Sequence, residues 1–499
     1  MTISDTLFTS PKQAMDLLWA RVRQRGDLPG FSSAVRAILG AMRGEDDREF
    51  SMTKTVLSDP ALTQKVLRLA NSPMYAVFGG QINTVSKAVI VLGTEAIGHL
   101  ALGLKLIDGL SDVSDESENT RAQMEKALLA GQIARYVASS ASTRDAEEAV
   151  VCSMLHSLGR MMVAFYLADY WLAIQTRCAG DGLAEAEAVR AVLGMQLDEI
   201  GRLIAQHWGL PASLVNSLQD MLPQEVSEPL DHADWLAAVS TMATSCANVL
   251  HHNNSSTMEA ISIIANDYAE MLGLEVSQVL TAIDAVQANT QEEAALIRPA
   301  REIDMRKNAP ASVGKPDDTL NILANGIHDM REALQRISAA QLMSMALETV
   351  YKGFGFSRAI AFLRNQETAK YVAHMCFGEG AQDILPHLAF GDAYQPDVFH
   401  AALANDKMIF VENAQDQKFI NKLPRWWKEQ FPTSRSFIVL PLSINQQPMG
   451  FIYGDWDQHL FPSKIEAAEI LSLNELRALV MQAYERWQHA CNGAKVKGR

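Results

Sequence analysis

The stretch AVVCSMLHSLGRMMVAFYL, residues Ala149 to Leu167, decides the fold of the N-terminal half. It is mostly apolar, and Asp145 and Glu148 stand at its start with the spacing of a capping box. The pattern predicts a mostly apolar helix that ends near His156. Gly159 then predicts a tight turn, because glycine tolerates backbone conformations that other residues avoid.

Residues 10–290 have helical periodicity almost throughout, and strand-like alternation is scarce. Asp59 can cap a helix whose first position Pro60 occupies. Gly209 and Pro211 supply the left-handed residue and the breaker that favour the end of another helix. These signals predict an all-α domain over residues 10–290.

The pattern changes after residue 290. Residues 291–319 carry prolines and charges without an apolar stripe, which predicts a linker. Residues 320–490 begin with helical patterns, and the following short runs are rich in β-branched and aromatic residues: RAIAFLR, YVAHMCF, MIFVE, SFIVLPLSI and GFIYGDW. The turn NQQP joins the last two runs. We expect an α/β domain with an antiparallel sheet and flanking helices.

Composition restricts the function. The net charge of −15 argues against a large nucleic-acid or anionic-membrane surface, because both need clustered Lys and Arg. The five cysteines have no C-x-x-C spacing, which indicates free thiols in a reducing compartment. The sequence shows no basic segment followed by an apolar run at its start and no uninterrupted run of roughly 20 apolar residues. We expect a cytoplasmic protein that binds neither nucleic acid nor membrane.

The N-terminal half resembles the HDOD family of bacterial signalling proteins, which are related to HD-type phosphohydrolases. The resemblance covers about residues 15–285 and rests on four stretches in the family's order: LSDPALTQKVLRLANSPMYA, TVSKAVIVLGTEAIGHLAL, AVVCSMLHSLGRMMV and HWGLP. The remnant of the family motif consists of His156, Ser157, Gly159 and Arg160. We expect Arg160 to pair with a nearby acid.

In HD enzymes, a His-Asp pair and further histidines hold two metal ions that activate water. Here Ser157 follows His156, and a hydroxyl cannot replace a bridging carboxylate. By this resemblance, side chains without a nitrogen or oxygen ligand stand at the other ligand positions: Leu129, Leu197, Met221 and Leu222. We therefore expect no metal, no cofactor and no catalysis, with His156 held by local hydrogen bonds. We give the pair His251-His252 little weight as a metal site.

The C-terminal part resembles a GAF domain, a small-molecule-sensing and dimerising module, over about residues 330–487. The stretches FGFSRAIAFL, DVFHAALANDKMIFVENA and SRSFIVLPLSINQQPMGFIYGDW carry the resemblance. Aromatic and arginine side chains are candidates to line a ligand pocket: Arg358, Trp426, Trp427, Arg435, Phe437 and Tyr453. The alternative, that these aromatic residues belong to the core, stays equally open at this point.

Together these patterns predict a multidomain protein, an all-α HDOD domain followed by an α/β GAF domain. The expected function is noncatalytic bacterial signal transduction, in which the HDOD module presents a surface to a protein partner or a nucleotide. The GAF module would regulate it by sensing a small molecule, or would form a homodimer. Two alternatives stay open: a metal-dependent phosphohydrolase acting on a nucleotide or cyclic dinucleotide, and a constitutive scaffold.

Overall fold

The computed structural model describes most of the chain. The described residues are 10–25, 31–43, 48–71, 81–114, 118–139, 143–224, 228–252, 257–289, 314–460 and 463–497. The predicted linker, 291–319, lies outside the described residues as far as residue 313.

The chain folds into two compact units, each described here by itself. Unit 1 consists of Met1–Arg48, Gln64–Val77 and Leu92–Arg306. Unit 2 consists of Glu49–Thr63, Phe78–Val91 and Lys307–Arg499. Unit 2 therefore combines the C-terminal part of the chain with two short segments from the N-terminal half.

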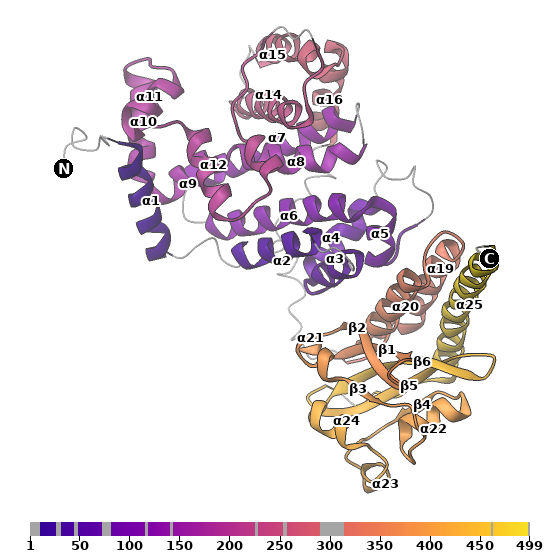
Figure 1. The fold of residues 1–499 in the computed structure, drawn as a ribbon. Coiled ribbons are helices and arrows are strands. Elements are labelled where there is room, and N and C mark those ends of the chain that lie inside the picture. Colours follow the sequence, from indigo (N-terminus) through magenta and orange to yellow (C-terminus); the bar gives the residue numbers. More distant parts are fainter. Residues whose placement is uncertain are drawn as a thin grey trace. The chain divides into compact units, whose positions relative to one another are not determined.

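Unit 1 is built from helices around a core of α7, α8 and α14 (Figure 1). Its helices are α1 (Pro11–Arg25), α2 (Phe31–Arg43), α6 (Thr94–Ser114), α7 (Glu118–Ser139), α8 (Thr143–His156), α9 (Leu158–Tyr166), α10 (Ala168–Gly180), α11 (Glu185–Leu193), α12 (Leu197–His207), α13 (Ala212–Asn216), α14 (His232–His252), α15 (Thr257–Leu272) and α16 (Val276–Asn289). Helix α4 (Pro60–Ala70) runs from unit 2 into unit 1.

The apolar stretch Ala149 to Leu167 forms most of α8 and all of α9. The predicted helix end at His156 is confirmed, but the predicted capping box is wrong, because α8 begins at Thr143 and contains both acids. Glu148 instead contacts the His232 Nε2 atom at 2.8 Å. Residues Glu148–Tyr166 are long and apolar enough to cross a membrane, yet 83% of this window is buried inside the protein. Core helices have the same composition, so the burial accounts for the apolar run.

The residues that predict a helix start at α4 and a helix end at α12 lie where these helices begin and end. Helix α4 begins at Pro60, and the Asp59 Oδ1 atom accepts a hydrogen bond from the Leu62 amide at 3.0 Å. Helix α12 ends at His207, and Gly209 has the left-handed φ of 74°. Both predictions are confirmed because they depend only on neighbouring residues.

Unit 2 contains a six-stranded antiparallel sheet in the order β3-β2-β1-β6-β5-β4. Its strands are β1 (Arg358–Asn365), β2 (Lys370–Phe377), β3 (Ala389–Gly391), β4 (Ile409–Val411), β5 (Ser434–Ile444) and β6 (Gln447–Asp457). The five predicted strands are confirmed, whereas β3 was not predicted because its sequence, AFG, contains no β-branched residue and ends in glycine. Asn445 and Gln446 turn the β5–β6 hairpin with φ of 49° and 62°, as a two-residue hairpin turn requires.

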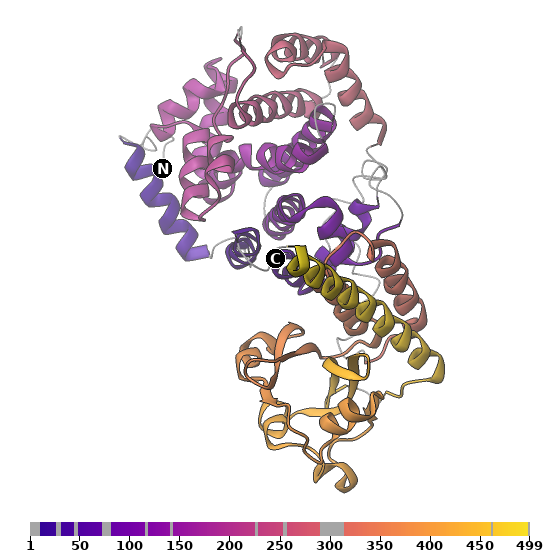
Figure 2. The ribbon, with the colours of Figure 1, turned by 45° about the vertical axis from the view of Figure 1, so that its right-hand side comes forward.

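The two faces of this curled sheet carry separate cores. Helices α19 (Thr319–Ala333), α20 (Ala339–Phe354) and α25 (Ala467–Lys497) cover one face (Figures 1 and 2). Short helices and loops cover the other face, among them α21 (Ala381–Ile384), the 3-10 turn Leu385–His387, α22 (Val398–Asn405), α23 (Gln417–Ile420) and α24 (Arg425–Gln430). The expected order, a helical domain followed by an antiparallel-sheet domain, is confirmed.

Unit 2 also contains helices α3 (Arg48–Leu57) and α5 (Val85–Leu92), apart from their terminal residues Arg48 and Leu92. Phe50, Leu57 and Ile90 pack against the core formed by the sheet and its three long helices. The rings of Phe50 and Phe377 lie 5.1 Å apart, which places α3 directly on this core.

Candidate functional site

His156 is the last residue of α8, and its side chain is only 5% exposed. Its Nε2 atom lies 3.3 Å from the Thr241 hydroxyl and 3.2 Å from Asp220 Oδ1, and its Nδ1 atom lies 3.3 Å from the Thr244 hydroxyl. Thr241 donates its own proton to the carbonyl oxygen of Ala237. Nε2 therefore carries the imidazole proton, and Nδ1 accepts from Thr244.

This environment keeps His156 neutral. Burial, and after it the positive charge of Arg160, lowers the pKa of His156 to about 4. Because the ring is neutral at neutral pH, its 3.2 Å contact with Asp220 is not an ion pair there.

Gly159 lies within α9, so the predicted tight turn at this residue is wrong. Its backbone is instead pressed against the start of α12, where a Cβ atom on Gly159 would overlap the Leu197 carbonyl oxygen and lie 2.9 Å from the Gly201 amide nitrogen. The contact is equally close from α12, because a Cβ atom added to Gly201 would lie 3.2 Å from the Gly159 nitrogen. The remnant motif thus fixes a close contact between two helices.

Arg160 pairs with Glu185 of α11, which confirms the expected acidic partner. Further charges gather nearby. Arg202 lies 3.2 Å from Asp198 of the same helix. Burial, and then the negative charge of Asp220, raises the pKa of Asp198. Burial and the proximity of Arg160 lower the pKa of Lys126 on α7.

Neither aspartate of this site was predicted from the sequence. Asp198 directly follows Leu197, and Asp220 directly precedes Met221, so each acid is one residue away from an expected ligand position. Both acids are visible in the sequence, but moving one position along a helix turns the direction of the side chain by about 100°. Only the structure shows that Asp220 reaches His156.

The donor set does not fit the binuclear metal centre of HD enzymes. Ser157 is 3% exposed and provides no carboxylate. Leu222 is 79% exposed, so it points into solvent. Among the residues that the structure describes, no group of three or more His, Cys, Asp or Glu side chains is arranged to hold a metal ion. His251 contacts Glu125 at 3.4 Å.

The six candidate pocket residues of the sheet domain gather on and around the sheet's loop-covered face. Phe437, Tyr453 and Trp427 are at most 2% exposed, and Trp426 is partly buried at the edge of the same core. Aromatic rings fill the space between sheet and loops. The Phe437 ring stacks on Phe399 at 5.8 Å, and the Trp426 ring stacks on Phe390 at 4.9 Å.

A buried polar chain runs through this aromatic core. The Trp427 Nε1 atom donates to the Tyr453 hydroxyl at 3.0 Å, and that hydroxyl donates to Asp455 Oδ2 at 3.2 Å. Arg358 forms two hydrogen bonds to the same carboxylate, 2.7 and 3.1 Å long, and lies over the Phe431 ring. Arg358 thus binds the buried carboxylate of Asp455.

Arg435 occupies an irregularity of β5, where the register with β6 shifts between Ser434 and Ser436. Its carbonyl oxygen accepts from the Ala414 amide at 2.6 Å. Its Nε and Nη2 atoms are buried and have no hydrogen-bond partner within the described part of the chain. Whether these six residues bind a ligand stays a prediction.

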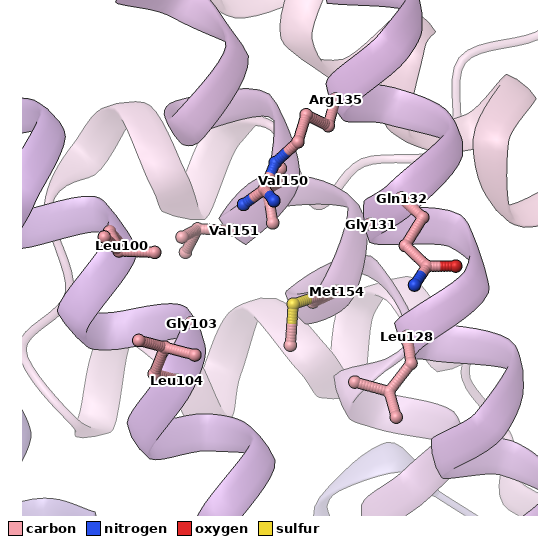
Figure 3. Close-up of a pocket in the computed structure, with 10 residues that line it drawn as sticks. All are labelled: Leu100, Gly103, Leu104, Leu128, Gly131, Gln132, Arg135, Val150, Val151 and Met154. Atoms are coloured by element: carbon pink, nitrogen blue, oxygen red, sulfur yellow. The ribbon is translucent and has the colours of Figure 1, made fainter. Parts of the chain in front are cut away.

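A separate small cavity lies in unit 1 between α6, α7 and α8 (Figure 3). Its volume of about 20 Å³ is close to that of a single water site. The lining is mainly apolar: Leu100, Gly103, Leu104, Leu128, Gly131, Gln132, Arg135, Val150, Val151 and Met154. The cavity is too small for an organic ligand without rearrangement of its walls.

Comparisons with known proteins bear on the helical part. Residues 28–221 match the family model of the HDOD domain. An uncharacterized protein of Treponema pallidum (strain Nichols) is 24% identical over 204 residues, which are 39% of this chain and 37% of that protein. The chain thus spans little more than a third of the length of this relative.

Several solved structures are similar to parts of this chain. An HDOD domain protein of unknown function from Geobacter sulfurreducens is 17% identical, with 57% of this chain and 97% of that chain covered and a TM-score of 0.40. A candidate phosphohydrolase from Shewanella amazonensis is 21% identical, with 56% and 98% covered and a TM-score of 0.42. The GAF domain of an Acinetobacter phosphoenolpyruvate-protein phosphotransferase is 13% identical, with 34% and 98% covered and a TM-score of 0.27. By the family match, residues 28–221 carry an HDOD domain.

Proposed function

We propose that this chain is a noncatalytic bacterial signalling protein. Its HDOD domain presents a surface to a protein partner or a nucleotide, and its sheet domain is a GAF-type module that regulates this surface or joins two chains. The protein acts in the cytoplasm and needs no metal or cofactor.

The state of His156 carries this proposal. A histidine that binds a metal uses a free lone pair on one ring nitrogen, and a second group orients the other nitrogen. Here Thr244 donates to the only lone pair, and the protonated Nε2 faces Thr241 and Asp220. With Ser157 next to it, the site is arranged as a satisfied polar core rather than as an open coordination sphere.

The GAF-type assignment is supported by the division of the sheet into two faces. Three long helices cover one face, and loops with short helices cover the other. The aromatic filling of the loop-covered side favours action through the flanking helices over tight binding of a large ligand. Exposed Leu320 on α19 and Leu471 on α25 offer apolar contacts for a second copy.

Elemental analysis tests the noncatalytic proposal against the phosphohydrolase alternative. The full chain is expressed in medium supplemented with Mn, Fe, Zn and Ni, and hydrolysis of cyclic dinucleotides is assayed with the same preparation. We expect no stoichiometric metal and no turnover above the His156→Gln variant. Two metal equivalents per chain, lost together with hydrolysis in that variant, would establish the enzyme instead.

Light scattering tests the association of two chains. The mass at micromolar concentration should correspond to a dimer, and a double substitution of Leu320 and Leu471 by Ser should shift it toward the monomer. A wild-type monomer at this concentration would remove dimerisation from the proposal and leave the regulatory role.

A further inference from the structure

The first turn of α5 is held by two acids that lie far away in the sequence. The Glu348 carboxylate accepts hydrogen bonds from the Val85 and Ser86 amides, both 2.8 Å long. The Asp329 carboxylate accepts from the Asn83 and Thr84 amides, both 2.9 Å long. Four consecutive backbone N–H groups thus point at two carboxylates.

Side chains complete the arrangement. Asp329 also accepts from the Asn83 side-chain amide and the Thr84 hydroxyl, each at 3.0 Å. The Lys87 ammonium lies 3.1 Å from Asp329 and 2.6 Å from Glu332. The Ser86 and Ser344 hydroxyl oxygens lie 3.3 Å apart.

Both carboxylates are completely buried, with 0% exposure for Asp329 and for Glu348. A buried charge is costly unless hydrogen bonds and opposite charge compensate for it. Here the amides and the positive end of the α5 dipole compensate for both acids, and Lys87 adds to this at Asp329. Neither the helix nor the acids can separate without leaving groups unsatisfied.

The two acids sit on a closely packed helix pair. A Cβ atom on Gly326 of α19 would overlap the Thr349 side chain of α20, and one on Gly353 would lie 2.8 Å from the Leu323 side chain. Gly326 is one turn before Asp329, and Thr349 follows Glu348 directly. The glycines therefore fix the spacing of the two carboxylates.

The same helices are tied to the sheet. The carbonyl oxygen of Phe354, the last residue of α20, accepts from the Trp456 indole on β6 at 2.9 Å. The Ser357 amide donates to the Asp455 carbonyl oxygen at 2.7 Å. Asp455 is the acid that Arg358 and Tyr453 hold in the aromatic core. Helix α20 therefore carries Glu348 and is also hydrogen-bonded at its end to β6.

We propose that Asp329, Glu348 and the amides of Asn83 to Ser86 form an amide latch. Through it, the sheet domain controls the part of the HDOD domain that begins with α5 and continues through Gly93 into α6. When closed, the latch holds the start of α5 on α19 and α20. When open, it releases this turn, and α6 becomes more mobile. The proposal rests on the regulatory role of the sheet domain and deepens it.

Hydrogen exchange of the full chain, followed by mass spectrometry, tests the latch. The variant is Asp329→Asn with Glu348→Gln, which keeps the side-chain shapes but removes both charges. The control is Asp318→Asn, an exposed residue before α19 whose side chain makes no capping hydrogen bond. We expect slow exchange of the 83–86 amides in the wild type and at least about tenfold faster exchange in the variant, since each lost charge-assisted bond favours opening.

The exchange of α6 separates a latch from a simple helix cap. A latch predicts faster exchange in α6 as well, with β5 and β6 unchanged in both variant and control. Unprotected 83–86 amides in the wild type would overturn the proposal, and so would an unchanged α6 in a variant whose α5 turn has opened. Neither result depends on metal content or hydrolysis. The noncatalytic proposal is therefore tested independently of the latch.

A disulfide supplies a second test if the charge variant does not fold. Ser86→Cys with Ser344→Cys places two sulfurs where the two hydroxyls now meet. Oxidation should link them readily and slow exchange in α6 relative to the reduced protein, while each single Cys variant stays unaffected by oxidant. Failure to form the bond, or identical exchange of α6 in both redox states, would contradict the latch.

Discussion

Gly159 touches the Leu197 carbonyl oxygen so closely that no side chain fits between α9 and α12. The obstacle is backbone on both sides, so it cannot be relieved by a change of rotamer. We predict that Gly159→Ala lowers the free energy of unfolding by about 2 kcal/mol or more, in the upper range for overpacked cores. Denaturant unfolding of the helical domain measures this effect.

Gly40→Ala in α2 is the matched control. Gly40 is exposed, and its Cβ would meet nothing within 4 Å. Alanine favours a helix over glycine by about 1 kcal/mol, so this variant should be slightly stabilised. Equal effects of the two substitutions would contradict the close contact.

The second prediction concerns pH. Because the pKa of His156 is about 4 in the folded protein and 6.5 is its ordinary value, the unfolded chain takes up a proton first as the pH falls. The stability that neutral His156 contributes is therefore complete above pH 6.5 and is lost between pH 6.5 and 4. At 1.36 kcal/mol per pKa unit, the loss approaches about 3 kcal/mol.

His156→Gln removes this titration while keeping a polar side chain. The difference in free energy of unfolding between wild type and variant should shrink as the pH falls through this window. Half-buried Asp198, whose pKa is raised, acts in the opposite direction but is common to both proteins. Parallel pH curves would show that His156 is not held neutral.

The third prediction tests the buried pair of the sheet domain. Asp455 is 0% exposed and Arg358 binds it with two hydrogen bonds. Removing either partner leaves the other charge buried, so Arg358→Met and Asp455→Ala should each cost about 3–5 kcal/mol. The double variant should cost clearly less than the sum, because it leaves no uncompensated charge.

Arg425→Met provides the comparison for this cycle. Arg425 pairs with Glu429 on the surface, where its side chain is 91% exposed. Solvent screens such a pair, so no measurable change is expected. An additive cycle at Arg358 and Asp455 would indicate that their contact is not formed.

The fourth prediction concerns thiol reactivity. Burial raises the pKa of Cys246 to about 12, and it also raises the pKa of Cys152 and Cys376. Only the thiolate reacts with disulfide reagents, so these three thiols should react after unfolding. Cys178 is partly exposed and should react in the native protein. A Cys491→Ser background leaves only these four thiols. Labelling followed by peptide mapping then identifies the order in which they react.

Local sequence chemistry predicted much of the secondary structure. Pro60 and Gly209 mark helix ends through their own backbone preferences, and the short apolar run within Arg358–Asn365 marks a strand. The exceptions are informative. The acids Asp145 and Glu148 have the spacing of a helix start, but α8 begins earlier, at Thr143.

The candidate sites were less predictable. The sequence placed His156 at a helix end and predicted an acid beside Arg160, but it did not reveal Asp198 or Asp220. Whether an acid next to an expected ligand reaches the histidine depends on helix rotation and on the loop after α13. For the aromatic residues of the sheet domain, composition was compatible with a pocket or a core, and only the tertiary structure shows that Trp427, Phe437 and Tyr453 are buried.

By itself, the sequence determined where helices and strands form and which family motif the helical part carries, because these depend on residues a few positions apart. Tertiary structure decided which distant groups compensate one another. Glu348 meets the amides of Val85 and Ser86 across more than 260 residues of sequence, since buried carboxylates and helix N–H groups require partners that no local pattern specifies.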